Sequence, residues 1–289
     1  MKTSKTMLQK VGAAALTALM IGGCSQSNPA SSSSASPISV LSREDGSGTR
    51  SAFSELFQLE KDGQDLTVPD AEITNSTAVM MATVTQNPNA IGYISLGSLN
   101  DTIKALAIDG VKPSVETVTD GTYSISRPFL IVEKEGAENE LAADFKEYIL
   151  SDQGQKIIAD AGYVPIANSG SWSSDGVSGS LTVGGSSSVT PVMEKLAEDY
   201  QKQNDQAEIS VLQTDSSTGA SSTAEGVYDI GMLSRELKEE EKSQSLVSTP
   251  IAQDGIALIV SVDNPVDSLS KSQVQDIYTG AVTDWSELN

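Results

Sequence analysis

The residues best suited to chemistry lie in a polar loop at positions 42–50, with the sequence Ser-Arg-Glu-Asp-Gly-Ser-Gly-Thr-Arg. A β-prone run, Ile38 to Leu41, precedes this loop, and apolar residues at helical spacing follow it between positions 51 and 59. The loop is therefore predicted to join the end of a strand to the start of a helix. Its glycines allow the backbone to bend with N–H groups exposed, and its hydroxyls are suited to capping the helix.

A helix start of this kind attracts anions, because its first N–H groups are free and carry partial positive charge. Arg43 adds a guanidinium that grips an oxyanion through two parallel hydrogen bonds. Asp45 is placed to hold that guanidinium in position. The alternative is a capped turn whose charges are merely solvated, since serine and glycine are common at helix starts.

The composition excludes several classes of protein. The 289 residues include 18 basic and 39 acidic ones, which gives a net charge of −21. Such a surface repels nucleic acid, so we expect no nucleic-acid partner and an anion site that relies on short-range hydrogen bonds, dipoles and local arginines. The chain has no histidine and one cysteine. This excludes Ser-His-Asp and Cys-His catalysis, most zinc sites and any internal disulfide, and we expect no metal and no cofactor.

The N-terminal segment resembles an export signal, with a basic start and an apolar run at 11–21 that is short for a membrane span. The sequence Ile-Gly-Gly-Cys at 21–24 resembles a bacterial lipobox, in which the cysteine becomes the lipidated N-terminus. The resemblance implies a signal peptide over 1–23, a lipid anchor on Cys24 and a location on the extracytoplasmic face of the cell membrane. The Ser-rich stretch 24–37 is expected to be a flexible tether.

Three further segments show the same order of strand, hydroxyl-rich turn and helix start, around residues 73–77, 184–191 and 215–220. In open α/β sheets, ligands bind at the carboxyl ends of strands and against helix N-termini. With Arg43 and Arg235, these turns favour a site for a small tetrahedral oxyanion such as phosphate or sulfate. Nothing suggests chemistry on the bound ion, because the chain lacks a phosphate-loop lysine motif and a nucleophile elbow.

Other segments give simpler expectations. A helix is predicted over 141–161, with a break at 151–156. The charged run at 236–242 is expected to be a solvated helix face. Trp172, in a Ser/Gly-rich stretch, is expected to be a partly exposed anchor.

Several motifs resemble the phosphate-binding lipoproteins of bacterial ABC phosphate importers, and together they cover nearly all of residues 38–289. The matching stretches are 42–50, 87–93 (Asn-Pro-Asn-Ala-Ile-Gly-Tyr), 154–156 (Gly-Gln-Lys), 186–191 (Ser-Ser-Ser-Val-Thr-Pro) and 229–237 (Asp-Ile-Gly-Met-Leu-Ser-Arg-Glu-Leu). The resemblance implies an α/β chain with the two-lobed class II periplasmic binding protein fold. It also implies closure over inorganic phosphate, delivery to the permease subunits of an ABC transporter, and no enzymatic activity.

The order of the motifs differs from that of the family, in which the half carrying 186–191 comes first. The chain is therefore predicted to be circularly permuted, with the old ends joined through a Ser/Gly linker at 168–178. We expect lobe I over residues 126–262, including this linker, and lobe II from residues 38–125 plus 263–289. A rival arrangement is a swapped dimer, in which the two halves pair between chains.

By the same resemblance, two half-sites are expected to face each other between the lobes. The implied phosphate-binding residues are Arg43, Ser47, Gly48 and Thr49 from one lobe and Ser187, Ser188, Ser216 and Ser234 from the other. Asp45 and Arg235 are implied as supporting residues, with Asp45 orienting Arg43.

Ser234 stands where some relatives carry an aspartate that accepts a proton from phosphate. A carboxylate there favours protonated phosphate over sulfate, because like charges would otherwise face each other. Asp215 and Asp45 are the candidates for this role here. Asp215 is more simply explained as the cap of its own turn.

Two other functions stay open. One is a phosphate sensor or surface adhesin with the same fold and no transport role. The other is a hydrolase that uses one of the many serines, which the lack of histidine disfavours. In the transport hypothesis the lobes close about hinges near 124–128 and 260–264.

Overall fold

The computed structural model describes residues 36–166 and 169–288. The predicted signal peptide, the lipidation site Cys24 and most of the predicted tether lie outside these residues. The last tether residue, Pro37, forms an isolated β-bridge with Asp284 near the other end of the chain. Within the two described ranges, no helix is both long enough and apolar enough to cross a membrane.

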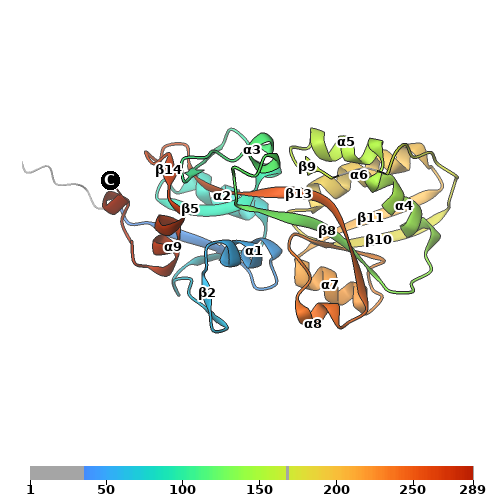
Figure 1. Ribbon diagram of the computed structural model, residues 1–289, viewed down its shortest axis with the longest axis horizontal. Coiled ribbons are helices and arrows are strands. Elements are labelled where there is room, and N and C mark those ends of the chain that lie inside the picture. The colour runs from blue at the N-terminus through green and yellow to red at the C-terminus, as the bar shows by residue number, and fades with distance from the viewer. Residues whose placement is uncertain (1–35, 167–168, 289) are drawn as a thin grey trace, which may run out of the picture. The chain divides into compact units, whose positions relative to one another are not determined.

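The framework is a mixed β-sheet with parallel strands at its two ends and antiparallel strands between them (Figure 1). In spatial order its strands are β11 (Ala207–Thr214), β10 (Gly179–Ser186), β12 (Ile230–Leu233), β8 (Ser126–Lys134), β13 (Leu246–Ser261), β5 (Ala90–Ser95), β1 (Ser39–Arg43) and β4 (Glu72–Thr74). β10 pairs in parallel with β11 and β12, whereas β1 pairs in parallel with β4 and β5. The antiparallel pair β8 and β13 connects these two parallel groups.

Shorter strands complete the sheets. They are β2 (Glu60–Lys61) paired with β3 (Gln64–Asp65), β7 (Ala107–Ile108) paired with β14 (Ser268–Leu269), and β6 (Ile103–Ala105) and β9 (Val164–Pro165), which both pair with β13. Two short 3-10 helices follow β5 and precede the C-terminus, η1 (Leu96–Ser98) and η2 (Trp285–Leu288).

Most of the helices begin at a capping side chain, the exceptions being α6 and α8. They are α1 (Gly48–Leu56), α2 (Thr77–Gln86), α3 (Val115–Thr119), α4 (Glu140–Leu150), α5 (Asp152–Asp160), α6 (Thr190–Gln203), α7 (Ser216–Ala224), α8 (Glu239–Lys242) and α9 (Lys271–Thr279). Ser76 caps α2 by accepting a hydrogen bond from the Val79 N–H. The predicted break in the helix over 141–161 is confirmed, because Ser151 ends α4 and its side chain caps α5.

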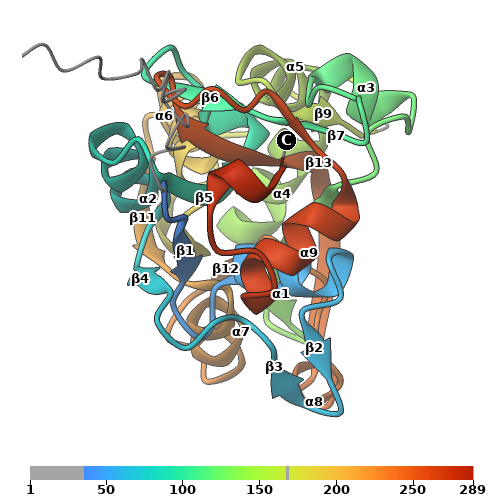
Figure 2. The same ribbon diagram turned by 90° about the vertical axis from the view of Figure 1, so that its left-hand side faces the viewer.

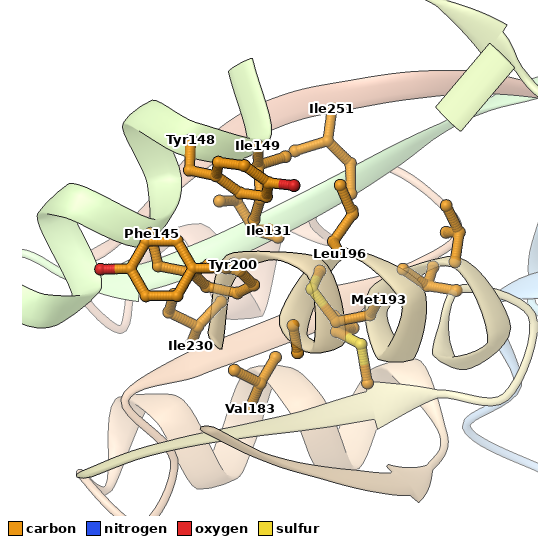
Figure 3. Close-up of a cluster of buried hydrophobic side chains, with 14 of the residues drawn as sticks. Ile131, Phe145, Tyr148, Ile149, Val183, Met193, Leu196, Tyr200, Ile230 and Ile251 are labelled. Carbon is orange, nitrogen blue, oxygen red and sulfur yellow. The ribbon is translucent and has the colours of Figure 1, made fainter. Parts of the chain in front are cut away.

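The first hydrophobic core packs α4, α5 and α6 against β8, β10 and β12. Figure 3 shows aromatic rings of α4 and α6 gathered over the sheet residues Ile131 and Ile230. The ring centroids of Phe145 and Tyr200 lie 5.2 Å apart in an edge-on arrangement, a favourable geometry for aromatic pairs.

Trp172 belongs to this first core. Its side chain is only 9% exposed, its ring lies edge-on to Tyr148 at 5.1 Å, and its Nε1 donates to Asp144 at 2.8 Å. The prediction of a partly exposed anchor is therefore wrong, because the indole fills a gap in the aromatic cluster. Residues 169–178 have no regular secondary structure, but this side chain fixes them to the core.

The second core lies around β1 and β5. Helices α1 and α9 cover one face (Figure 2). There the Phe53 ring stacks on Tyr93 at 3.9 Å and meets Tyr278 edge-on at 4.7 Å. Helix α2 covers the other face, with Met80 packed among residues of β1, β5 and β13. The strands are thus buried on both sides, as parallel strands require.

Strand β13 has buried residues in both cores, and β8 begins directly after a residue of the second core. Ile251 of β13 belongs to the first core, whereas Ile256 and Leu258 of the same strand belong to the second. Phe129 of β8 packs in the first core, and Ile125, directly before β8, packs in the second. These two paired strands therefore cross from one core to the other, as Figure 1 shows.

Candidate anion site

The loop after β1 forms the strand-to-helix junction that its sequence predicts. Gly46 has a φ of 88°, which turns the chain back toward the start of α1. Ser47 caps the helix, since its Oγ accepts the Arg50 N–H at 3.3 Å. Gly48 and Thr49 are the first helical residues and are buried, so their N–H groups have no partner within the helix and face the protein interior.

Arg43 reaches from the end of β1 to the opposite half of the sheet. The side chain is 2% exposed, and its Nη2 donates to the Oγ of Ser187 at 2.9 Å. Nε and Nη2 each lie 2.8 Å from a carboxylate oxygen of Glu44. Its Nη1 is buried and has no hydrogen-bond partner among the described residues.

The prediction that Asp45 orients Arg43 is wrong. The side chain of Asp45 is 99% exposed and forms an ion pair with Arg50 instead. The chain turns away from the strand after Glu44, so residue 45 faces solvent and residue 44 lies beside the guanidinium. Asp45 is consequently no candidate for accepting a proton from a buried anion.

Tyr93 of the neighbouring strand β5 holds the end of β1 in place. Its hydroxyl accepts the Arg43 N–H at 3.1 Å and lies 3.0 Å from the Oγ of Ser42. Burial raises the pKa of this phenol above its ordinary value, so it stays protonated. The backbone position of Arg43 is therefore set by a neutral hydrogen bond from the neighbouring strand β5.

The facing loop runs from the end of β10 to the start of α6. Ser188 lies within it, with its Oγ 2.8 Å from the Oγ1 of Thr49, and both residues are buried. The N–H of Ser188 donates to the Oγ of Ser186, which ends the strand. The predicted meeting of the two loops is confirmed by this contact and by the Arg43–Ser187 bond.

Ser216 and Ser234 complete the cluster from α7 and the end of β12. The Ser234 N–H donates to the Oγ of Ser216 at 3.1 Å, and its own Oγ lies 2.9 Å from that of Ser186. A Cβ built on Gly48 would overlap the Ser216 hydroxyl and lie 2.6 Å from the Ser234 Oγ. Glycine at position 48 therefore lets the start of α1 approach the Ser216 and Ser234 side chains this closely.

Asp215 is a helix cap, as the simpler explanation predicts. Its carboxylate accepts the N–H of Thr218 at 2.9 Å and the hydroxyl of the same residue at 2.6 Å. With these bonds it stabilises the start of α7. The alternative role for Asp215, as proton acceptor in the anion site, has no support from its contacts.

Arg235 lies beside the cluster and supports it indirectly. Its guanidinium donates to both carboxylate oxygens of Glu241 at 2.6 Å and to the Oγ of Ser217 at 3.0 Å. Glu241 is 6% exposed, so the expectation of a solvated helix face at 236–242 is wrong at this residue, and only Glu239–Lys242 is helical. The buried ion pair ties α8 to the start of α7.

The eight predicted site residues thus lie on loops that meet, and all are buried. Sequence reasoning missed Glu44, Ser186 and Glu241. Ser186 stands in the quoted serine run, and its place as the last strand residue was the available signal. Hydroxyls, helix N–H groups and a guanidinium form a donor-rich set, which suits an oxyanion.

A polar cavity of about 890 Å³ adjoins the cluster. Its wall includes Gly46 and Ser47 from one side and Arg235 and Glu236 from the other. It therefore borders the site rather than enclosing Arg43. Within the part of the chain that the structure describes, no group of histidine, cysteine, aspartate or glutamate is arranged to hold a metal ion.

Two groups of parallel strands joined by two crossing strands, with polar loops meeting between them, define a two-lobed ligand-binding protein. A family model described as "PBP superfamily domain" matches residues 8–153 and 171–289, and the chain belongs to this superfamily. The predicted α/β periplasmic binding protein class is thereby confirmed, leaving the circular permutation aside.

Within the superfamily, the sequence is similar to proteins named for phosphate. It is 50% identical over 275 residues to "Phosphate-binding protein PstS 2" of Streptococcus agalactiae serotype V, covering 93% of each chain. A crystal structure from Streptococcus pneumoniae, described as a phosphate ABC transporter, phosphate-binding protein, matches with a TM-score of 0.71 and 44% identity, covering 88% of this chain and 100% of that chain. "Phosphate-binding protein PstS" of Bacillus subtilis matches over 113 residues at 37% identity, or 38% of each chain. The predicted resemblance to phosphate-binding receptors is confirmed.

Proposed function

We propose that the chain binds inorganic phosphate outside the cytoplasm and delivers it to the permease subunits of an ABC importer. One observation supports this most strongly: Arg43, whose Nη2 joins loops 43–49 and 186–188 by its bond to Ser187, has a second nitrogen, Nη1, that is buried and has no partner within residues 36–166 and 169–288. A buried guanidinium N–H of this kind costs free energy until an acceptor binds it. A phosphate oxygen is such an acceptor, and the relatives are named for that ion.

In this proposal the ion binds where the two loops meet. Arg43 and the first N–H groups of α1, from Gly48 and Thr49, donate from one side. The hydroxyls of Ser47, Ser187, Ser188, Ser216 and Ser234 complete the set of ligands. A hydroxyl both donates and accepts, so a protonated phosphate oxygen also finds a partner there.

The proposed lobes are residues 126–262 and residues 38–125 plus 263–289. The crossing strands β8 and β13 form the hinge between them in this proposal, because β13 packs in both cores and β8 enters the first core directly after Ile125, which packs in the second. The second boundary is better placed near Gly255 than at residue 262, because Ile256 and Leu258 already pack in the second core.

The circular permutation stays part of the proposal. The match to Streptococcus agalactiae covers 93% of each chain, whereas the match to Bacillus subtilis covers 38% of each. Two chains that carry the same halves in opposite order align in sequence over one half only. The Bacillus subtilis match is consistent with this, because it covers 38% of each chain, which is less than half.

We also propose that residues 1–23 are removed as a signal peptide and that Cys24 carries a lipid anchor at the cell membrane. Metabolic labelling with a fatty-acid analogue tests the anchor, and Cys24→Ser is the control that should lose the label. Retention of the label in that variant would place the lipid elsewhere.

Isothermal titration of the soluble chain from residue 36 onward tests the central proposal. Phosphate should bind with micromolar affinity or tighter, and Arg43→Ala should weaken binding by about 100-fold, since charge-assisted hydrogen bonds are lost. Lys202→Ala is the matched control, because it removes one positive charge from an exposed pair with Glu198 on α6. The absence of heat from wild-type protein and phosphate would overturn the proposal.

Transport is a separate step and needs its own test. Deleting the gene should lower phosphate uptake by the cells if the protein is an importer receptor. Unchanged uptake, with phosphate binding intact, would favour the phosphate sensor or adhesin instead.

A further inference from the structure

The crossing of β8 and β13 carries a buried ion pair. Arg127 and Asp254 stand opposite each other in the ladder between the two strands. Their side chains are 2% and 0% exposed. Asp254 lies between Ile251 of the first core and Ile256 of the second. Arg127 lies between Phe129 of the first core and Ile125, the residue before β8, of the second, so the pair is a charged point between two hydrophobic regions.

The carboxylate of Asp254 joins three segments of chain. Its Oδ2 accepts from Nε and Nη2 of Arg127 at 3.2 and 3.0 Å. Its Oδ1 accepts the hydroxyl of Ser95 at 2.8 Å and the N–H of Leu96 at 3.2 Å, at the end of β5. The pair thus fixes β8 and β13 against the last residue of a third strand.

That third strand leads directly to the anion site. Tyr93, two residues before Ser95 on β5, holds the Arg43 N–H through its hydroxyl. A short series of contacts therefore runs from Asp254 through Ser95 and the β5 backbone to Tyr93 and Arg43. Neither Arg127 nor Asp254 is itself bonded to a predicted phosphate ligand in the described part of the chain.

Burial of the Arg127–Asp254 pair costs free energy of folding, so a role beyond stability is expected for it. Two charges lose their hydration there, and apolar side chains of similar volume are often as stable at such a position. The Nη1 of Arg127 is in addition buried without a partner among the residues described. Burial lowers the pKa of Arg127, Asp254 opposes this, and the positive charge of Arg43 adds to the lowering.

We propose that Arg127 and Asp254 are positioning residues for the anion site. They hold the crossing strands and the end of β5 in the arrangement in which Arg43 meets Ser187, and they do so without touching the ligand. The inference rests on the proposed function, because phosphate affinity is its readout. Its prediction is that a change at the crossing alters the affinity of a site to which it contributes no ligand.

The test is phosphate titration of conservative variants, each checked for a cooperative thermal transition. Asp254→Asn and Ser95→Ala should each weaken phosphate binding by about fivefold or more, the lower range of a typical coupling between sites. Ser95→Ala removes one hydroxyl only, so it remains informative if Asp254→Asn fails to fold. Glu133→Gln is the control. Glu133 lies on β8, as Arg127 does, but forms a partly exposed ion pair with Lys146 of α4.

Rescue separates positioning from general loss of stability. Arg127→Lys keeps a positive charge and should recover part of the affinity that Arg127→Met loses. The combined Arg127→Met and Asp254→Asn variant should bind no more weakly than the weaker single variant, because both break the same contact.

The outcomes are distinct. Folded variants of Asp254 and Ser95 that bind phosphate as tightly as wild type would overturn this inference and leave the proposed function standing. Equal affinity of Arg127→Lys and Arg127→Met, with both variants weakened, would also count against it. A wild-type chain that binds no phosphate would overturn the proposed function and this inference with it.

Discussion

Arg43 and Arg127 are both buried arginines with a carboxylate partner and an Nη1 that has no partner in the described residues, yet their partners differ. Glu44 is the next residue in the chain, and its side chain is 21% exposed. Asp254 lies 127 positions away and is completely buried. The first pair is local and faces the edge of the site, whereas the second joins distant segments inside the fold.

Because one pair is local and the other joins distant segments, we expect the Arg43–Glu44 and Arg127–Asp254 pairs to have different roles. A partner that is adjacent in sequence orients a guanidinium without linking any other element, and the remaining N–H groups stay available for Ser187 and a ligand. A distant partner also accepts hydrogen bonds from other segments, as Asp254 does from Ser95 and Leu96. The molecule thus uses one kind of contact for recognition and the other for placing the recognition loop.

The largest effect expected from this comparison is on stability. Arg127→Met leaves the Asp254 carboxylate buried and unpaired, so the free energy of unfolding should fall by about 3 to 5 kcal/mol. Arg43→Met should cost less, about 1 to 2 kcal/mol, because Glu44 keeps contact with water. Urea unfolding of the two variants measures both values, and equal losses would contradict the distinction.

The pH dependence of stability should show the buried carboxylate directly. Burial raises the pKa of Asp254 to about 6, although Arg127 and the hydrogen bonds from Ser95 and Leu96 act in the opposite direction. A carboxyl whose pKa is higher in the folded state stabilises the fold below its unfolded pKa, and this contribution is lost as pH rises through about 6.

Lowering the pH from 7 to 5 should therefore stabilise wild type relative to Asp254→Asn, by about 1 kcal/mol. Tyr123 and Tyr163 also face Asp254, but burial raises their pKa values, so they stay neutral in this range. Arg127 stays charged. Thermal melting of both proteins across this range gives the difference, and parallel profiles would rule out the titration.

The close approach of Gly48 in α1 to Ser216 in α7 gives a third prediction. In Gly48→Ala the new Cβ overlaps the Ser216 hydroxyl, so either this hydroxyl rotates or the starts of α1 and α7 move apart, and we expect a loss of about 1 to 3 kcal/mol in stability. Phosphate affinity should fall as well. Adding Ser216→Ala removes the overlapping oxygen and should restore part of the stability. No recovery in the double variant would mean that the clash lies elsewhere.

The smallest effect concerns the local pair. Glu44→Gln keeps the shape of the side chain but removes the charge that aligns Arg43, so phosphate affinity should fall by about five- to tenfold. This is less than the loss expected for Arg43→Ala. Asp45→Asn is the matched control, because Asp45 pairs with Arg50 and faces solvent. A larger effect at Asp45 than at Glu44 would reverse the assignment.

The strand-to-helix junctions were predictable because their signals are local. Gly46, Ser47 and Asp215 act at the turn or cap that contains them, so a run of neighbouring residues reveals their role. Resemblance to a family then indicated which junctions meet, and the contacts of Arg43 with Ser187 and of Thr49 with Ser188 agree.

The errors involve side-chain direction and distant partners. Asp45 and Glu44 differ by one position, and only the geometry of the turn decides which of them reaches Arg43. Glu241 lies in a run of charges and gives no sequence signal that it pairs with buried Arg235. Asp254 lies within the largely apolar strand β13, and its partner is more than a hundred residues away. Such contacts depend on the assembled fold.

The buried indole of Trp172 has a consequence for a chain that is cut. Residues 169–178 lack regular structure, so a protease could cleave there, yet the indole would keep that segment attached to α4. The fragment before the cut carries Arg43 and its loop, and the fragment after it carries the serines at 187, 216 and 234. Neither fragment holds a whole site, so reassociation of the separated pieces would be reported by the return of ligand binding.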